Sequence, residues 1–87
     1  MYVIVAYDIG VDRLDGVRQV LKQYLNWIQN SAFEGELSEG KLEELRLKVK
    51  EMIAPEVDSV VFFKISNPTW VSKVILGREK GAVGAVL

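Results

Sequence analysis

Apolar residues in this chain switch between strand-like and helix-like spacing, and the order of these switches constrains the fold more than any other feature. The chain opens with a continuous apolar run at Tyr2–Tyr7, which is too short for a helix and rich in residues that favour strands. Such a run predicts a strand that is covered on both faces. Asp8 follows directly, so we expect a carboxylate at the carboxyl end of a central strand.

Two stretches show the three- and four-residue spacing of an amphipathic helix. The first helix is predicted over Val11–Leu25. Ser38 is a natural N-cap for the second helix, over Glu39–Ile53, which Pro55 ends. The predicted apolar stripes are Val11, Leu14, Val17, Leu21 and Tyr24 in the first helix, and Leu42, Leu45, Val49, Met52 and Ile53 in the second.

Three further segments have the composition of strands. Trp27–Leu37 is predicted as one strand or a bent pair of strands with a polar middle, in which Gly35 supplies a bulge or turn. Asp58–Ile65 is the third β run, and Trp70–Leu76 is expected to form a further short strand. The apolar tail Ala82–Leu87 is a template for pairing with another chain.

This order of elements predicts an α+β fold, a ferredoxin-like two-layer sandwich with two helices on one face of an antiparallel sheet. The 87 residues are expected to form a single domain over 1–87. A two-layer sandwich leaves the other face of its sheet uncovered. Because apolar residues lie on both sides of the first and third strands, we expect that face to meet its copy in a twofold homodimer.

The chain contains no cysteine and no histidine. This absence excludes disulfides, thiolate nucleophiles, zinc clusters and Ser-His triads. Any chemistry must therefore use carboxylates, lysine, tyrosine or a bound metal. The first residues lack the basic segment of a secretion signal, and the apolar run is much shorter than a membrane span, so we expect a cytoplasmic protein with no membrane partner.

The charge is unevenly distributed, although the net charge is only −1. Glu34–Asp58 holds eight acidic and four basic residues, whereas Lys64–Leu87 holds four basic residues and one acidic residue. On the first predicted helix, Arg18 and Lys22 lie four residues apart on the solvent side. A basic face is thus compatible with the total, and the alternative for each cation is an ordinary solvated surface charge.

Two segments contain candidate functional residues. For Asp8, the spacing favours a structural role in which the carboxylate accepts hydrogen bonds from amides that open the next helix; catalysis is the alternative. Gln29–Glu34 places polar side chains in the middle of a predicted strand, where they either line a solvated edge or meet a ligand phosphate. Phe33 within this segment is expected to be a core residue rather than a platform for stacking bases.

These segments, in their order, resemble one known family. Tyr2–Ile9, Trp27–Leu37 and Asp58–Ile65 together resemble the Cas-two (Cas2) family of CRISPR-associated proteins, the small subunit of spacer acquisition. The similarity covers nearly the whole chain. It rests on three segments at the right spacing rather than on one decisive motif.

The resemblance implies a ferredoxin-like homodimer whose last strand, here Ala82–Leu87, crosses to the partner's sheet. It implies that Asp8 is the metal-binding and catalytic aspartate, with Mg²⁺ or Mn²⁺ as cofactor. It also implies assembly with the Cas-one (Cas1) integrase, binding of duplex prespacer DNA, and an endonuclease activity on RNA or double-stranded DNA. Whether this chain is an enzyme stays open at this point.

One aspartate per chain is too little for a nuclease, but twofold symmetry brings two Asp8 carboxylates toward one cleft. Arg13, Arg18, Lys22 and Ser31 are the candidate contacts to nucleic acid, and we expect the amide of Gly10 to help position a phosphate. Family members usually carry a basic pair after the aspartate's turn, whereas Leu14 and Asp15 follow Arg13 here. The alternatives are a DNA-binding scaffold without catalysis and a ferredoxin-like module that binds a small regulatory ligand.

Overall fold

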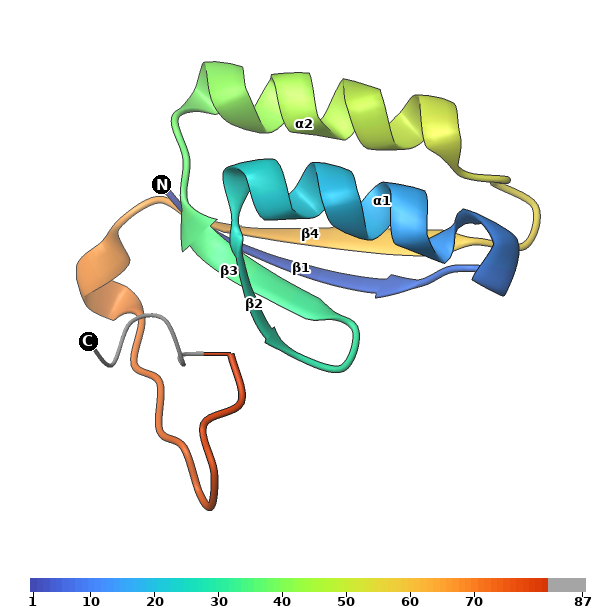
Figure 1. The fold of residues 1–87 in the computed structure, drawn as a ribbon. Coiled ribbons are helices and arrows are strands. Elements are labelled where there is room, and N and C mark those ends of the chain that lie inside the picture. The colour runs from blue at the N-terminus through green and yellow to red at the C-terminus, as the bar shows by residue number, and fades with distance from the viewer. Residues whose placement is uncertain (82–87) are drawn as a thin grey trace.

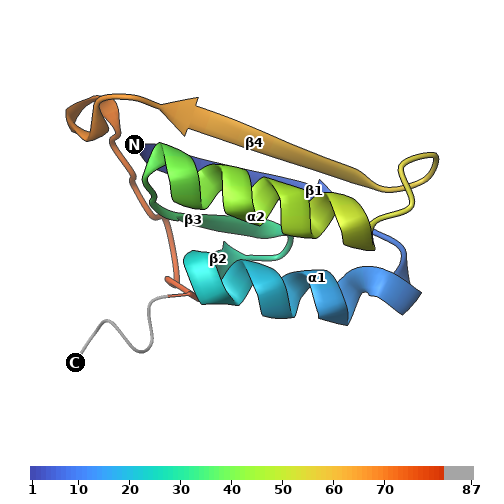
Figure 2. The same ribbon diagram turned by 90° about the horizontal axis from the view of Figure 1, so that it is seen from above.

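The computed structural model describes residues 1–81, in which two helices cover one face of a four-stranded sheet (Figures 1 and 2). The elements in chain order are β1 (Tyr2–Asp8), α1 (Val11–Tyr24), β2 (Asn26–Gln29), β3 (Ala32–Glu36), α2 (Glu39–Met52), β4 (Ser59–Ile65) and the short 3-10 helix η1 (Pro68–Trp70). The strand order is β2-β3-β1-β4, and each neighbouring pair is antiparallel. The predicted ferredoxin-like α+β sandwich is therefore confirmed.

The hydrophobic core fills the layer between the sheet and the helices. Alternate residues of β1, namely Val3, Val5 and Tyr7, are buried, as expected when successive side chains point to opposite faces. Phe33 of β3 is fully buried, which confirms the prediction that it is a core residue. The helices contribute Val17, Leu21, Leu42, Leu45 and Val49 to the same cluster.

The predicted helices are confirmed to within one residue at their ends. The backbone amide of Lys41 donates a 3.2 Å hydrogen bond to Ser38 Oγ, so Ser38 is the N-cap of α2 as expected. One residue of the predicted α1 stripe is misplaced, because Val11 is 87% exposed. Figure 2 shows the first turn of α1 past the end of β1.

The segment between the helices forms the bent pair of strands that the sequence predicts. A turn at Asn30, whose φ of 44° is in the left-handed region, joins β2 to β3. The bulge lies between Trp27 and Gln29 of β2, so the prediction that Gly35 supplies it is wrong. Gly35 pairs regularly with Val3, and a Cβ atom there would lie 3.0 Å from Leu25 Cδ2, which makes close packing its role.

The prediction of a strand over Trp70–Leu76 is wrong. Its first residue ends the helix η1, and residues 71–76 form no strand within the described part of the chain. A strand needs a neighbour with which to pair, whereas this segment leaves β4 and crosses to the β2 side of the molecule (Figure 2). There Gly81 approaches so closely that a Cβ atom on it would lie 1.9 Å from the Trp27 carbonyl oxygen. The predicted crossing strand Ala82–Leu87 lies outside the described residues.

The sheet face opposite the helices carries apolar side chains. Val61 and Phe63 of β4 are 44% and 53% exposed, and they alternate with residues that point toward the helices. Figure 1 shows the helices on one side of the sheet and the segment after η1 on the other. Neither helix in residues 1–81 combines the length and apolarity needed to cross a membrane.

Candidate active site

Asp8 is the last residue of β1, and its neighbour across the sheet is Ser59 of β4. It alternates with the buried Tyr7, so the strand pleat directs Asp8 to the open face of the sheet. Its side chain is exposed there. The carboxylate is therefore accessible to a ligand at the edge of the apolar face that carries Phe63.

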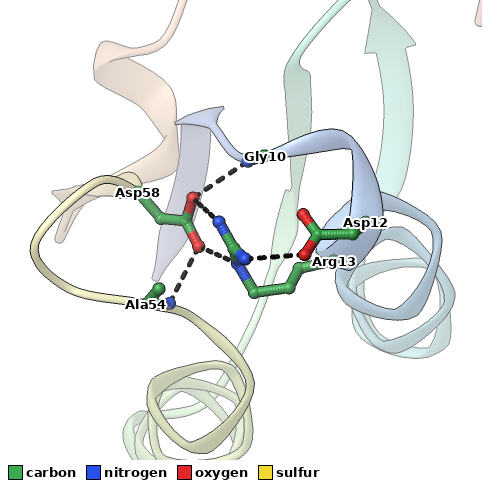
Figure 3. Close-up of polar contacts among 5 residues, drawn as sticks. All are labelled: Gly10, Asp12, Arg13, Ala54 and Asp58. Atoms are coloured by element: carbon green, nitrogen blue, oxygen red, sulfur yellow. Dashed lines mark hydrogen bonds and ion pairs between the residues drawn. The ribbon is translucent and has the colours of Figure 1, made fainter.

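The hydrogen bonds that tie down the turn between β1 and α1 go to Asp58, which sequence reasoning did not single out (Figure 3). Its Oδ1 accepts from the Gly10 amide at 2.9 Å and from Arg13 Nη2 at 2.8 Å. Its Oδ2 accepts from Arg13 Nε at 2.5 Å and from the Ala54 amide at 2.8 Å. We call this group of four residues the Asp58 clamp.

The Asp58 clamp corrects two expectations. The structural role that the spacing favours for Asp8, accepting an amide at the start of the next helix, belongs to Asp58 instead. The amide of Gly10 is used in that contact, so it is not free to hold a phosphate in this conformation. In the sequence, Asp58 stands between the end of a predicted helix and an apolar strand. Loop backbone amides need hydrogen-bond acceptors at such a position, and this could have identified Asp58.

The surroundings of Asp58 and Arg13 favour the ionised form of both side chains. The Asp58 side chain is 0% exposed, and its hydrogen bonds from Arg13 hold the pKa of that carboxyl well below its ordinary value of 3.8. The Ala54 and Gly10 amides lower this pKa further, against the effect of burial. The same hydrogen bonds raise the pKa of Arg13, so the pair is charged throughout the neutral range.

Arg13 has intramolecular partners on all three guanidinium nitrogens. In addition to the two bonds to Asp58, its Nη1 donates to Asp12 Oδ2 at 3.1 Å. A guanidinium group that already donates two hydrogen bonds to one carboxylate is less available to bind a phosphate. The predicted contact between Arg13 and nucleic acid stays a prediction.

Ser31 lies at the same end of the sheet as Asp8. Its carbonyl oxygen accepts a 3.1 Å hydrogen bond from the amide of Tyr7, the residue before Asp8. The Tyr7 hydroxyl points to the Asn30 carbonyl at 3.5 Å, and burial raises the pKa of this hydroxyl against the opposing effect of the Arg18 charge. The fold thus brings together the two segments in which the sequence predicted functional residues.

The other two predicted nucleic-acid contacts lie on α1. Lys22 is exposed, and Arg18 is half-buried with an Nε atom that has no hydrogen-bond partner within the described residues. An unsatisfied buried donor is uncommon and is an opportunity for an external acceptor. The structure leaves the role of both residues untested.

Residues 1–81 of one chain do not by themselves complete a metal site. Within residues 1–81 there is no group of three or more aspartate, glutamate, cysteine or histidine side chains that could hold a metal ion. Carboxylate oxygens nevertheless suit Mg²⁺ and Mn²⁺, and Mg²⁺ commonly uses one or two carboxylates with water and substrate phosphate. The exposed Asp8 fits such an ion when further oxygen ligands, such as water, a substrate phosphate or a second Asp8, complete the coordination.

The family model described as CRISPR associated protein Cas2 matches residues 1–73. The chain belongs to the Cas2 family. It is 46% identical to a protein named CRISPR-associated endoribonuclease Cas2 3 from Thermodesulfovibrio yellowstonii, over 99% of this chain and 98% of the relative. It is 44% identical to CRISPR-associated endoribonuclease Cas2 2 from Archaeoglobus fulgidus, over 97% of this chain and 91% of that protein.

Solved structures agree with this membership. A crystal structure titled as that of Cas2 superposes with a TM-score of 0.83 at 44% identity and covers 92% of this chain and 90% of its own. Streptococcus pyogenes Cas2, at 23% identity and a TM-score of 0.72, shares the fold. The resemblance seen in the sequence is thereby confirmed, and the ferredoxin-like sandwich is the fold of Cas2 structures.

Proposed function

We propose that this Cas2 chain is the adaptation subunit of a CRISPR system, a homodimer that binds prespacer DNA and bridges dimers of the Cas-one integrase. We further propose a metal-dependent endonuclease activity on RNA or double-stranded DNA at paired Asp8 side chains. One observation carries the proposal: the exposed Asp8 lies on the same sheet face as the exposed apolar residues Val61 and Phe63. The curated relatives are named endoribonucleases, and these names support the proposed activity on RNA.

The apolar face supports the homodimer. Exposed Val61 and Phe63 lie on the side of β4 that the helices do not cover, and burying such side chains is the main source of association free energy. Sheet-to-sheet contact about a twofold axis pairs this surface with itself. The same axis relates the two Asp8 carboxylates, which gives the dimer a pair of acidic ligands. Ala82–Leu87 is proposed to extend the partner's sheet.

Replacing Phe63 with aspartate is expected to convert the dimer to a monomer at micromolar concentration, because two charges would be buried at the twofold interface. Sedimentation velocity measures the change. The matched control is Leu47→Asp on α2, since Leu47 is 48% exposed on the opposite layer. Dimerisation of Phe63→Asp with wild-type affinity, or equal loss in both variants, contradicts the proposed interface.

The chemistry proposed for the site is hydrolysis of a phosphodiester. When bound, Mg²⁺ or Mn²⁺ supplies Lewis-acid activation of water and of the scissile phosphate. The contribution of this chain is to hold the ion through Asp8 and to orient the substrate beside the β2–β3 turn that contains Ser31. No histidine is needed for either task.

Arg18 and Lys22 are the proposed phosphate contacts. The exposed charges of α2 balance and partly pair with one another, so this helix offers a phosphate backbone no net attraction; they are Glu39, Glu43, Glu44 and Glu51 against Lys41, Arg46, Lys48 and Lys50. The half-buried Arg18 and the exposed Lys22 lie on α1, one helical turn apart. Nucleic acid is therefore expected to approach α1 rather than α2.

Reversing the charge of Arg18 and Lys22 together is expected to flatten the dependence of log K on log salt for duplex DNA by about 2, since each phosphate contact contributes about 0.9. A fluorescence anisotropy titration at several salt concentrations measures the slope. Reversing Arg46, which pairs with Glu43 on α2, is the control and should leave the slope unchanged. An unchanged slope in the double variant would move the DNA contact to another surface.

A scaffold without catalysis is the alternative function. It is favoured by the lack of a three-ligand acidic group within residues 1–81. Both the scaffold function and the endonuclease function predict that the protein co-purifies with DNA-loaded Cas-one integrase. Only the endonuclease function predicts cleavage that depends on a divalent metal and on Asp8.

A further inference from the structure

We infer that Asp58 and Arg13 are positioning residues for the Asp8 site: the Asp58 clamp fixes the backbone on both sides of the Asp8 carboxylate. The inference rests on the proposed function, because it assigns a role within the same site. It also gives Arg13 a task other than contact with nucleic acid.

The Asp58 clamp contacts the backbone next to Asp8 both along the chain and across the sheet. Asp58 immediately precedes Ser59, and Ser59 is the residue paired with Asp8 across the sheet. The Gly10 amide that Asp58 holds belongs to the second residue after Asp8. One carboxylate therefore ties the strand beside Asp8 to the turn that follows Asp8, as Figure 3 shows for the Gly10, Arg13 and Ala54 contacts.

The contacts of Asp58 are numerous and directional. The fully buried Asp58 side chain accepts four hydrogen bonds, from two loop amides and two nitrogens of one guanidinium. Two-point contacts with a guanidinium fix direction as well as distance. The three segments joined this way are the β1–α1 turn, the start of α1 and the α2–β4 loop. A lysine in place of Arg13 would keep the charge and lose the two-point geometry.

The clamp is expected to affect metal binding at Asp8 and not only the stability of the fold. A metal site needs its ligand groups held close to their productive geometry by the surrounding structure. The side chain of Asp8 itself is exposed and is not packed in the core. Its backbone is thus the part of Asp8 that the fold can hold in place, and the clamp does so at the open end of β1.

The test uses the full-length protein and measures direct binding of Mn²⁺ by electron paramagnetic resonance, beside metal-dependent cleavage. Asp58→Asn and Arg13→Lys are expected to weaken Mn²⁺ binding about tenfold. Arg13→Lys keeps a buried ion pair, so it supplies a folded variant if Asp58→Asn unfolds. Leu45→Ala lowers stability from the fully buried core of α2, and Glu43→Gln removes a carboxylate that pairs with Arg46 on the surface.

The controls separate positioning from a general loss of stability. Mn²⁺ affinity per folded protein should be unchanged in Leu45→Ala and in Glu43→Gln, at temperatures where all variants are folded. Wild-type Mn²⁺ affinity in Arg13→Lys and Asp58→Asn overturns the inference, as does equal weakening in Leu45→Ala.

Mn²⁺ binding by Asp8→Asn distinguishes a wrong positioning role for the clamp from a wrong metal site at Asp8. If Asp8→Asn binds Mn²⁺ as tightly as the wild type, the proposed metal site at Asp8 is wrong. If Asp8→Asn loses binding while both clamp variants keep it, the metal site stands and the positioning role falls.

Discussion

Replacing Asp8 with asparagine is expected to reduce the proposed metal-dependent cleavage at least about a hundredfold, because the variant removes the proposed charged metal ligand from each protomer of the proposed dimer. Asparagine preserves the size of the side chain. Since Asp8 is exposed at the end of β1, the change should leave stability within about 0.5 kcal/mol of the wild type. The measurement is cleavage of RNA and of duplex DNA across a series of Mg²⁺ and Mn²⁺ concentrations.

Asp15→Asn is the matched control, since Asp15 is an exposed carboxylate on α1 and is not part of the Asp58 clamp. It should cleave as the wild type does. The proposed co-purification with the Cas-one integrase should persist in Asp8→Asn, which would separate the proposed enzymatic activity from the proposed adaptation role. Full activity in Asp8→Asn removes this residue from the reaction. A wild-type protein that cuts neither substrate supports the scaffold alternative.

The second large effect concerns acid stability, and Asp58 is expected to dominate it. Its carboxyl is ionised in the folded protein far below the ordinary pKa of 3.8 that applies when the chain unfolds. The unfolded chain therefore binds a proton first as the pH falls. The stabilisation is fully present above about pH 5 and is lost progressively as the pH falls below about 4 toward the folded-state pKa.

Asp58→Asn is expected to lower the midpoint of thermal unfolding at pH 7 by about 10 °C, because it leaves Arg13 without its buried partner. It should also make the midpoint less dependent on pH below 4. Thermal unfolding followed by circular dichroism between pH 2 and pH 7 measures both changes.

Glu43→Gln provides the comparison for this experiment. A hydrogen bond from Arg46 lowers the pKa of Glu43 as well, but this pair is on the surface of α2 and is screened by solvent. Its removal should change the unfolding midpoint little at any pH. If Asp58→Asn retains the full acid sensitivity of the wild type, the Asp58 clamp is not its source.

Local sequence patterns were sufficient to predict those elements whose structure depends on residues close together in the chain. The apolar run of β1, the stripes of the two helices and the Ser38 cap all follow from spacing and hydrogen-bonding chemistry within a few residues. The structure confirms them except for Val11, which is exposed. Trp70–Leu76 shows the limit of this reasoning. Its residues favour a strand, but a strand requires a partner, and no local pattern states whether a partner is adjacent.

The two aspartates of the site show the same limit more sharply. Both Asp8 and Asp58 stand at an end of an apolar strand, but the structural role was predicted for Asp8 alone. The antiparallel register places Asp58 next to the turn after β1 and against Arg13, 45 positions away in the chain. The register also places Asp8 on the uncovered face of the sheet. Burial and partners therefore separate the two carboxylates, and both depend on contacts distant in sequence.

The amino-acid sequence alone determined the element order, the α+β sandwich, the Cas2 resemblance and the prominence of Asp8. It did so because hydrophobic periodicity and helix capping act over a few residues. Only the tertiary structure decided that Asp58 is the buried acceptor, that Arg13 is its partner and that Asp8 is exposed beside an apolar face. Those assignments depend on which strands pair and on which elements cover each face of the sheet. The contacts join residues that are far apart in the sequence, so no local periodic pattern predicts them.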